Sequence, residues 1–274
     1  MKKIKVIVNG LPGKMASTVA AAVINSQDME LIPKSLTGPE ILLEHVFYDS
    51  KEIKLFGPSE IIKLLVDEIP DVIIDFTLPS AIEPNVDFYT KMKLPFVLGT
   101  TGGDMDYITK KVNESGLNAV VAPNMAKPIV AFQAMMEFAA SNFPGAFDGF
   151  NLKVKESHQK TKVDTSGTAK AMVAYFNKLG VPFLVDQIEK NRTNVGYAAM
   201  GIPVEDWAGH GWHTYSLNKE SDGSVFLEFT HNVNGRQIYA DGTLSAARFL
   251  FGVEARSLSH GHVYSMIDVL MAGK

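Results

Sequence analysis

The sequence predicts an α/β protein with two domains: a doubly wound parallel sheet, and an α+β domain whose sheet is mostly antiparallel or mixed. Continuous apolar segments alternate with helical segments up to about residue 127, which is typical of a parallel sheet covered on both faces. Beyond that point several segments alternate apolar and polar residues, as half-buried strands do. A turn that contains glycine joins the first apolar segment to the first helical one.

In the first half, each apolar segment has the length of a single strand. The β-branched residues 4–10 predict the first strand, and the alanine-rich residues 14–26 predict the first helix. Pro33 indicates a bend or a sheet edge in the strand expected over residues 29–38. An apolar helix is expected to begin at Ser59, which would cap it. Further buried strands are predicted over residues 70–79, 95–102 and 118–125.

The second half is expected to begin with a long helix over residues 131–143. Alternation over residues 149–159 predicts a strand, and residues 165–180 form the next predicted helix. The remaining short segments, with turns at Ser-Asp-Gly and Asn-Gly, predict strands and then two closing helices. These strands are expected over residues 190–202, 213–221, 223–233 and 236–242, and the helices over residues 243–253 and 265–274.

Length and composition agree with two globular domains. The chain has 274 residues, of which 46% are hydrophobic and 20% are charged. The pattern places one domain over residues 1–126, completed by residues 241–274, and the other over residues 127–240. A net charge of -4 without a long basic block argues against a nucleic-acid partner, and no apolar stretch is long enough to cross a membrane. The absence of cysteine excludes disulfides and favours a cytoplasmic location.

The turn Asn-Gly-Leu-Pro-Gly-Lys-Met-Ala follows the first predicted strand and opens the first helix. Gly10, Gly13 and Ala16 place small residues at three-residue steps, which permit a tight turn, close backbone approach and helix packing. The helix N-terminus would then direct free N–H groups at a pyrophosphate. The turn therefore predicts a Rossmann-like dinucleotide site, although a simple connector would have the same glycines. Its candidate cofactor-binding residues are Gly10, Leu11, Pro12, Gly13, Lys14 and Met15.

Three later turns add candidates for cofactor binding. Where an acidic residue usually binds the ribose of NAD, the second strand ends Leu36-Thr37-Gly38, without a carboxylate. Thr37, assisted by Lys34 and Ser35, therefore favours NADPH, with NADH also open. Gly-Thr-Thr-Gly and Ala-Pro-Asn-Met end two other strands, where ligands of doubly wound sheets bind; ordinary turn chemistry is the alternative. These turns contribute Gly99, Thr100, Thr101, Ala122, Pro123, Asn124 and Met125.

The stretch Glu-Ser-His-Gln-Lys-Thr-Lys-Val-Asp-Thr-Ser-Gly-Thr, which begins at Glu156, gathers charge before a predicted helix. Thr165 or Ser166 is expected to cap that helix, whose first-turn N–H groups favour a carboxylate. Lys162 and a second lysine add positive charge, so two anion sites in one loop predict a small dicarboxylate ligand. His158 beside them can donate a proton near neutral pH. The alternative is a solvated, lysine-rich loop that only caps a helix.

The chain resembles the dihydrodipicolinate (4-hydroxy-tetrahydrodipicolinate) reductase family over nearly its whole length. It carries in order the motifs Gly-Leu-Pro-Gly-Lys-Met, Asp-Phe-Thr-Leu-Pro-Ser, Gly-Thr-Thr-Gly, Ala-Pro-Asn-Met, the charged stretch above and a late Thr-His-Asn-Val-Asn-Gly-Arg. The bacterial form of the charged signature has a second histidine, an arginine and a proline. Here Gln159 and Lys160 stand at the first two positions and the proline is absent, which is more similar to the plant-type branch.

The resemblance implies that a cyclic dicarboxylate is reduced by NADPH or NADH in the diaminopimelate pathway to lysine, and that the protein is a homotetramer. It implies that His158 is the general acid and that Lys162 is a second donor or stabilises the developing anion. Two alternatives stay open: a related reductase of another small acid, and a protein that senses nucleotides without catalysis. The residues that would bind the substrate are Gln159, Lys162, Ser166, Gly167 and Thr168.

Two close pairs of histidines are metal-ligand residue types, His210 with His213 and His260 with His262. Neither pair has a cysteine or a clear carboxylate partner in the sequence, so no metal site is predicted. His231 lies in the late motif and receives no role.

Overall fold

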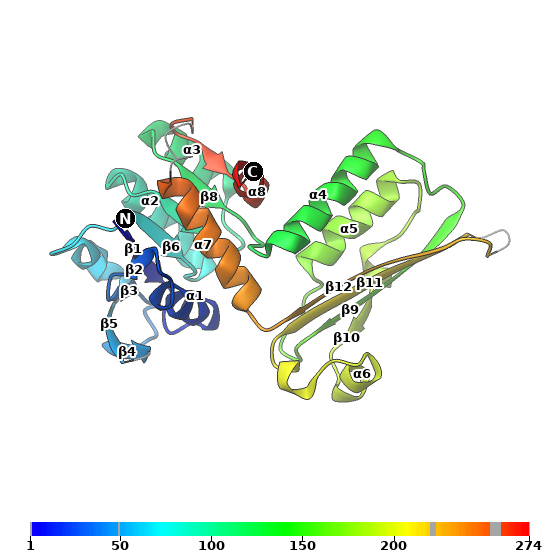
Figure 1. Cartoon of the computed structure of the whole chain (residues 1–274), viewed down its shortest axis with the longest axis horizontal. Helices are drawn as coiled ribbons and strands as arrows, with labels where there is room; N and C mark the ends of the chain where they lie inside the picture. The colour runs from blue at the N-terminus through cyan, green and yellow to red at the C-terminus, as the bar shows by residue number, and fades with distance from the viewer. Residues whose placement is uncertain (1, 49, 220–222, 253–258, 274) are drawn as a thin grey trace. The chain divides into compact units, whose positions relative to one another are not determined.

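The computed structural model describes residues 2–48, 50–219, 223–252 and 259–273. The chain divides into two compact units, coloured along the chain in Figure 1. Unit 1 comprises residues 1–127 and 237–274, and unit 2 comprises residues 128–236. The cofactor-binding and substrate-binding roles expected of the two units stay predictions.

Unit 1 is built on a six-stranded sheet in which every pairing among the described residues is parallel. The order across the sheet is β13-β8-β7-β6-β1-β2. From β1 the chain first adds β2 on one side and later β6 on the other, so the order reverses between β1 and β6. This arrangement confirms the predicted doubly wound sheet. The strands are β1 (Ile4–Asn9), β2 (Met29–Leu31), β6 (Val72–Asp75), β7 (Phe96–Leu98), β8 (Ala119–Val121) and β13 (Val263–Tyr264).

Helices cover both faces of this sheet, which is why most of its strand residues are apolar and buried (Figure 1). One layer is formed by α1 packed against α7, and another by α2 packed against α3. Ile7, Ile73, Tyr89 and Phe96 belong to the core on one side of the sheet. The helices are α1 (Lys14–Ile24), α2 (Ile82–Lys91), α3 (Met105–Ser115), α7 (Gln237–Phe251) and α8 (Met266–Ala272), with a short 3₁₀ helix η2 (Pro79–Ala81).

A three-stranded sheet beside α1 departs from the sequence predictions. The strand expected over residues 29–38 is interrupted at Pro33, and β3 (Lys34–Leu36) joins β5 (Lys51–Phe56) and β4 (His45–Tyr48) instead of the parallel sheet. The α-helix expected from Ser59 was wrong: η1 (Pro58–Leu65) is a 3₁₀ helix that begins after Gly57. The Glu60 carboxylate accepts the N–H of Gly57 at 3.4 Å, which satisfies that end of the helix without a serine cap.

Unit 2 contains a mixed four-stranded sheet in the order β10-β9-β11-β12, with only β10 and β9 parallel among the described pairings. This confirms the predicted mostly antiparallel α+β domain. Val154 and Tyr215 from the strands pack with Met172 and Phe176 of α5 in the core. The strands are β9 (Phe150–His158), β10 (Glu189–Asn191), β11 (His210–Lys219) and β12 (Phe226–Asn234); the helices are α4 (Lys127–Asn142), α5 (Gly167–Lys178), α6 (Asn194–Ala199), η3 (Val185–Gln187) and η4 (Val204–Asp206).

Two predicted strands of the second half were wrong. The strand expected over residues 190–202 ends at Asn191 and α6 follows, because Thr193 caps that helix by accepting the N–H of Gly196 at 3.1 Å. The strand expected over residues 236–242 is the first turn of α7. Gly242 is a packing residue there rather than a turn residue, because a Cβ would lie 1.7 Å from the carbonyl oxygen of Met125. Ser221 and Asp222 of the predicted Ser-Asp-Gly turn lie outside the described residues.

Candidate active site

The glycines of the first turn in unit 1 are required by backbone contacts. Gly10 has φ of 106°, and a Cβ there would lie 2.4 Å from the carbonyl oxygen of Phe76, at the end of β6. The N–H of Gly13 donates to the carbonyl of Gly10 at 2.8 Å, and a Cβ on Gly13 would lie 2.7 Å from the same oxygen. The first N–H groups of α1, from Lys14 and Met15 onward, have no intrahelical acceptor. The turn therefore fits a phosphate group.

The other predicted cofactor residues follow the carboxyl ends of neighbouring strands, which meet at one edge of a parallel sheet. After β7, the hydroxyl of Thr100 donates to the carbonyl of Thr77 at 2.8 Å, and this bond ties two strand ends together. After β8, the side-chain oxygen of Asn124 accepts the N–H of Ala126 at 2.9 Å, while Met125 is buried. The structure thus brings these turns to the same edge as the first glycine turn.

The strand end that was expected to favour NADPH is more complex than the sequence indicated. The hydroxyl of Thr37 is buried and has no hydrogen-bond partner among the described residues, so it is a polar group that a ligand could satisfy. Lys34 and Ser35 are engaged elsewhere, since they donate to the carbonyls of Val66 and Leu36. A carboxylate is also present, contrary to the sequence argument. Glu40 folds back so that its Oε1 would lie 2.3 Å from a Cβ placed on Gly38.

A buried carboxylate, which sequence reasoning missed, holds the carboxyl ends of two of these strands in place through hydrogen bonds. Asp75, at the end of β6, is fully buried and accepts hydrogen bonds from the Thr77 N–H (2.8 Å), Asn85 Nδ2 (3.0 Å) and the Tyr89 hydroxyl (2.7 Å). Asn9 of β1 donates to the same hydroxyl at 2.8 Å. Burial, followed by the Asp75 charge, raises the pKa of Tyr89 well above its usual range. The network locks β1, β6 and α2 together behind the glycine turn.

In unit 2 the predicted acid, His158, lies at the end of β9 among histidines from the adjacent strands. Its Nδ1 lies 3.1 Å from the carbonyl oxygen of His210, and its Nε2 lies 3.3 Å from Nε2 of His213. The ring of His213 is buried and stacks on His231, with centroids 4.6 Å apart. Gly211 leaves room for this arrangement, because a Cβ there would lie 3.0 Å from Cε1 of His158. Histidines considered only as metal ligands or given no role thus surround the predicted acid.

Hydrogen-bond chemistry assigns the proton positions in this cluster. A carbonyl only accepts, so neutral His158 carries its proton on Nδ1 and presents a lone pair at Nε2, to which His213 donates. Burial, and then the charges of Arg192 and Lys162, lower the pKa of His158 to about 4. Burial and the neighbouring histidines lower the pKa of His213 well below its usual range. Burial lowers the pKa of His231 to about 4. All three rings are therefore neutral at pH 7 in the free protein.

An ion pair lies beneath the β9–α5 loop, which we define as residues 159–166. Glu156 is fully buried; Arg192 donates to its Oε1, and the N–H of Ser166 donates to its Oε2 at 3.0 Å. Arg192 also donates from Nε to the carbonyl of Lys162 at 2.9 Å. Sequence reasoning missed Arg192 because it lies in the segment wrongly predicted as a strand. A glutamate on the buried face of β9 requires a cation, and that was the signal available.

The predicted substrate residues occupy this loop and the helix that follows it. The ammonium of Lys162 lies 3.0 Å from both carboxylate oxygens of Asp164, and this contact lowers the pKa of that carboxyl. The carbonyl of Gln159 accepts the N–H of Lys162 at 3.0 Å, which closes a turn. Ser166 is the N-cap of α5, but Glu156 takes up its N–H. The first-turn donors that have no intrahelical acceptor include the N–H groups of Gly167 and Thr168.

Three side chains of this site meet the distance requirement for a metal ion. Glu156, His158 and His213 each bring one ligand atom within 4.8 Å of the others. Both oxygens of Glu156, however, already accept hydrogen bonds from Arg192 and Ser166, and a metal would have to displace that pairing. The donor set therefore does not fit a metal in this arrangement, and the expectation of no metal stays a prediction.

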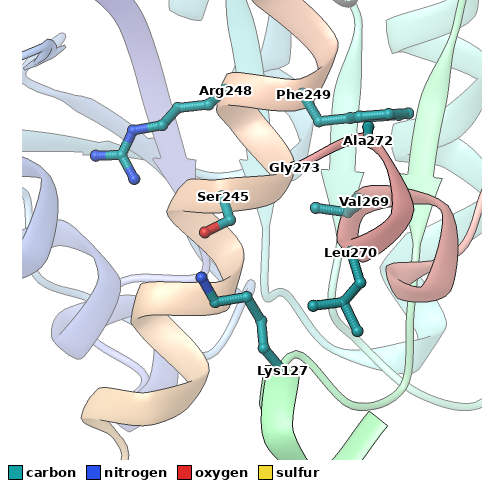
Figure 2. Close-up of a pocket in the computed structure, with 8 residues that line it drawn as sticks. All are labelled: Lys127, Ser245, Arg248, Phe249, Val269, Leu270, Ala272 and Gly273. Carbon is teal, nitrogen blue, oxygen red and sulfur yellow. The ribbon is translucent and has the colours of Figure 1, made fainter. Parts of the chain in front are cut away.

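A cavity of about 280 Å³ in unit 1 lies away from every residue predicted for the site. Figure 2 shows Phe249, Val269 and Leu270 along its wall, with Lys127 and Ser245 beside them. Arg248 points away from these apolar side chains and donates from Nε to Asp28 at 2.7 Å. Its polar lining consists of Lys127, Ser245 and Arg248, none of which was predicted for the site. No helix among the described residues is long and apolar enough to cross a membrane.

Comparison with known proteins covers both units. The model described as "Dihydrodipicolinate reductase, N-terminus" matches residues 4–125, and "Dihydrodipicolinate reductase, C-terminus" matches residues 128–270. Probable 4-hydroxy-tetrahydrodipicolinate reductase 2, chloroplastic, from Oryza sativa subsp. japonica is 43% identical over 273 residues, 98% of this chain and 83% of its own length. 4-Hydroxy-tetrahydrodipicolinate reductase 2, chloroplastic, from Arabidopsis thaliana is 43% identical over 275 residues, 98% of this chain and 78% of its own length.

A solved structure shares the fold. Dipicolinate-bound dihydrodipicolinate reductase from Paenisporosarcina sp. TG-14 superposes with a TM-score of 0.68 at 20% sequence identity, covering 97% of this chain and 99% of that one. The similarity to plant proteins confirms the plant-type resemblance indicated by Gln159 and the missing proline.

Proposed function

Because the chain belongs to the dihydrodipicolinate reductase family, we infer that it reduces 4-hydroxy-tetrahydrodipicolinate to tetrahydrodipicolinate with NADPH or NADH, in lysine biosynthesis. The substrate gains a hydride from the nucleotide and a proton, and its hydroxyl leaves as water. The observation that carries this inference is the match of both units to the two family models, together with the charged loop they include. A protein that only senses nucleotides would not need His158, Lys162 and the N-terminus of α5 gathered within and at the two ends of one loop. A related reductase of another small acid has no observation in its favour.

We propose that the nicotinamide nucleotide binds at the carboxyl edge of the parallel sheet in unit 1. When bound, it supplies the hydride. The fit rests on the backbone contacts that exclude side chains at Gly10 and Gly13, and on the unpartnered hydroxyl of Thr37. The first-turn N–H groups of α1 would bind the pyrophosphate. The turns after β7 and β8, at residues 99–101 and 122–125, would line the remainder of the nucleotide.

We propose that unit 2 binds the substrate through the β9–α5 loop. One carboxylate would meet the N–H groups of Gly167 and Thr168, and the other the ammonium of Lys162, since each is a donor suited to an anion. Gln159 at the start of the loop would add a polar contact. The dipicolinate bound to the structural neighbour is a cyclic dicarboxylate of the same class and supports this assignment.

His158 would donate the proton, and its surroundings define how. Its Nδ1 proton is held by the carbonyl of His210, so the transferable proton must enter at Nε2. His213 donates to that nitrogen in the free protein, so it would then have to accept there and carry its own proton on Nδ1. In the free protein the ring is neutral. A dianionic substrate beside it would favour the charged form and raise its pKa, because an opposite charge stabilises imidazolium. The substrate would thereby charge its own acid, while Lys162 steadies the developing negative charge.

The direct test follows the absorbance of the reduced nucleotide with and without the hydroxylated cyclic substrate. We expect oxidation only when the substrate is present, with either nucleotide. The function would be contradicted if the protein bound NADPH but failed to oxidise it with every cyclic dicarboxylate offered. Light scattering during size-exclusion chromatography tests the proposed homotetramer. The proposed cytoplasmic location would be tested by imaging a tagged chain, a needed step because the plant relatives are named as chloroplastic.

A further inference from the structure

Arg192 lies one residue beyond β10, where it faces the end of β9 and the beginning of the β9–α5 loop. Because β10 and β9 are parallel, with Asn191 opposite Ser157, the guanidinium reaches the point at which the chain leaves the sheet after His158. Its side chain is 16% exposed. An arginine at this place can act either as a ligand for the substrate or as a support for the loop.

The hydrogen bonds of Arg192 decide between these roles. A guanidinium has five N–H donors. Nε donates to the carbonyl of Lys162 at 2.9 Å. Nη1 donates to the carbonyls of Asn191 (2.9 Å) and Glu156 (3.5 Å). Nη2 donates to the Glu156 carboxylate and to the carbonyl of Asp164 (3.4 Å). Five acceptors match five donors, so no N–H remains for a substrate.

The contacts of Arg192 reach both the middle and the end of the loop. It holds the backbone at Lys162 and Asp164 directly. Through Glu156, whose second oxygen accepts the N–H of Ser166 at 3.0 Å, it also fixes the residue that caps α5. The positions of the Lys162 ammonium and of the α5 N-terminus relative to each other therefore depend on one planar side chain. A lysine cannot replace it, because its donors share a single nitrogen.

We propose that Arg192 is the positioning residue of the reduction: it holds the β9–α5 loop in the conformation that binds both substrate carboxylates, and it contacts no substrate itself. This inference rests on the proposed function of the loop. It assigns to Arg192 an effect on substrate affinity and on the order of the loop. It assigns none on the carboxyl edge of the parallel sheet in unit 1, where the nucleotide is proposed to bind and which we call the nucleotide edge.

The test compares wild type, Arg192→Lys, Arg192→Met and the control Lys190→Met, which removes an exposed lysine from the same segment. Hydrogen exchange followed by mass spectrometry reports on peptides that cover residues 159–168. We expect faster exchange there in both Arg192 variants, and no change in peptides from α4 or β12. Arg192→Met leaves Glu156 buried without its cation, so Arg192→Met combined with Glu156→Gln provides a second variant without an unpaired charge.

Binding and kinetics complete the test. Calorimetry with pyridine-2,6-dicarboxylate should show weaker binding in the Arg192 variants, and kcat/KM for the cyclic substrate should fall by roughly 10²-fold, as expected when reacting groups are misplaced by about 1 Å. The loss should lie mainly in KM for the cyclic substrate, with KM for the nucleotide unchanged. Lys190→Met should behave as wild type.

Three results would overturn the inference. Unchanged exchange with lost dicarboxylate binding would make Arg192 a direct ligand. Faster exchange throughout unit 2 would make it a general structural residue. Unchanged exchange and binding would give it no role. If wild type itself neither turns over the substrate nor binds the dicarboxylate, the proposed function fails, and the exchange measurements still decide whether Arg192 holds the loop.

Discussion

The proposed nucleotide edge of unit 1, at the carboxyl ends of its parallel strands, and the β9–α5 loop of unit 2 are constructed from different parts of the chain. The edge is shaped by backbone contacts, such as the close approach of Gly10 to Phe76. The loop is held by side chains that come from distant positions: Glu156 and Arg192 are 36 residues apart, and His158 and His213 are 55 apart. A site shaped by backbone should tolerate changes of pH, whereas a site of buried histidines and an ion pair should respond to them.

The largest expected effect is a loss of turnover from a substitution in unit 2, at His158. His158→Gln keeps a polar side chain of similar reach but removes the proton donor, so turnover should fall by roughly 10²–10⁴-fold. Nucleotide affinity, measured by fluorescence titration, should not change because the nucleotide edge lies in unit 1. His260→Gln, an exposed histidine of unit 1, is the matched control. Turnover like that of wild type in His158→Gln would remove His158 from the mechanism.

Acid should destabilise unit 2 before unit 1. The pKa values of His158 and His231 are lowered to about 4 in the folded chain, and an unfolded histidine titrates near 6.5. The unfolded state therefore binds more protons between these values. The stability is fully present above about pH 6.5 and falls as the pH drops toward 4, on the order of a few kcal/mol in total. Hydrogen exchange at pH 7 and pH 5 should show β11 and β12 opening first. Earlier opening of β1 and β6 would contradict this ordering.

A glycine substitution in unit 1 should weaken nucleotide binding and leave dicarboxylate binding to unit 2 in place. Gly10→Ala places a Cβ against the Phe76 carbonyl at a positive φ, which costs about 1–3 kcal/mol of strain. Nucleotide affinity and the melting temperature should both fall, while calorimetric binding of pyridine-2,6-dicarboxylate to unit 2 should persist. Gly57→Ala is the control, because a Cβ there meets nothing within 4 Å. Equal effects of the two substitutions would show that the turn is not shaped by this contact.

The smallest expected effect concerns the choice of nucleotide. The carboxylate of Glu40 lies against Gly38, next to Thr37, and would repel a 2′-phosphate. Glu40→Gln should therefore raise kcat/KM for NADPH relative to NADH by roughly two- to fivefold, the range of an exposed charge interaction. The factor by which Glu40→Gln changes this nucleotide preference should fall toward one in 0.5 M salt, where screening is strong. If Glu40→Gln left the ratio of kcat/KM for NADPH to that for NADH unchanged, the Glu40 carboxylate would not face the nucleotide.

More of the candidate residues could be named from the sequence for the proposed nucleotide edge than for the loop, for a physical reason. Spacing of glycines and strand ends is a local property, so Gly10, Gly13 and the turn at Gly99 could be placed from their neighbours along the chain. His158 and Lys162 could also be named as candidates because they share one short stretch. Their partners were missed, since Arg192 and His213 reach the site only through the pairing of β9 with β10 and β11.

The wrong elements have different causes. Residues 236–242 contain a glycine that suggested a turn, yet it is the contact with Met125 that requires Gly242 inside a helix. At Ser59 and Thr193 the sequence did carry the signal, since Glu60 accepts the N–H of Gly57 and Thr193 accepts the N–H of Gly196, three residues away in each case. Only the first of these errors needed the tertiary structure to correct.

We propose that the dicarboxylate charges a neutral histidine in unit 2, whereas the nucleotide binds mainly to backbone N–H groups in unit 1. Calorimetric binding enthalpies at pH 6, measured in two buffers of different ionisation enthalpy, give the protons taken up. Pyridine-2,6-dicarboxylate should take up a fraction approaching roughly one proton, declining as the pH rises, and His158→Gln should abolish it. NADH should take up none. Enthalpies that are equal in both buffers for the dicarboxylate, or proton uptake that survives in His158→Gln, would contradict the account.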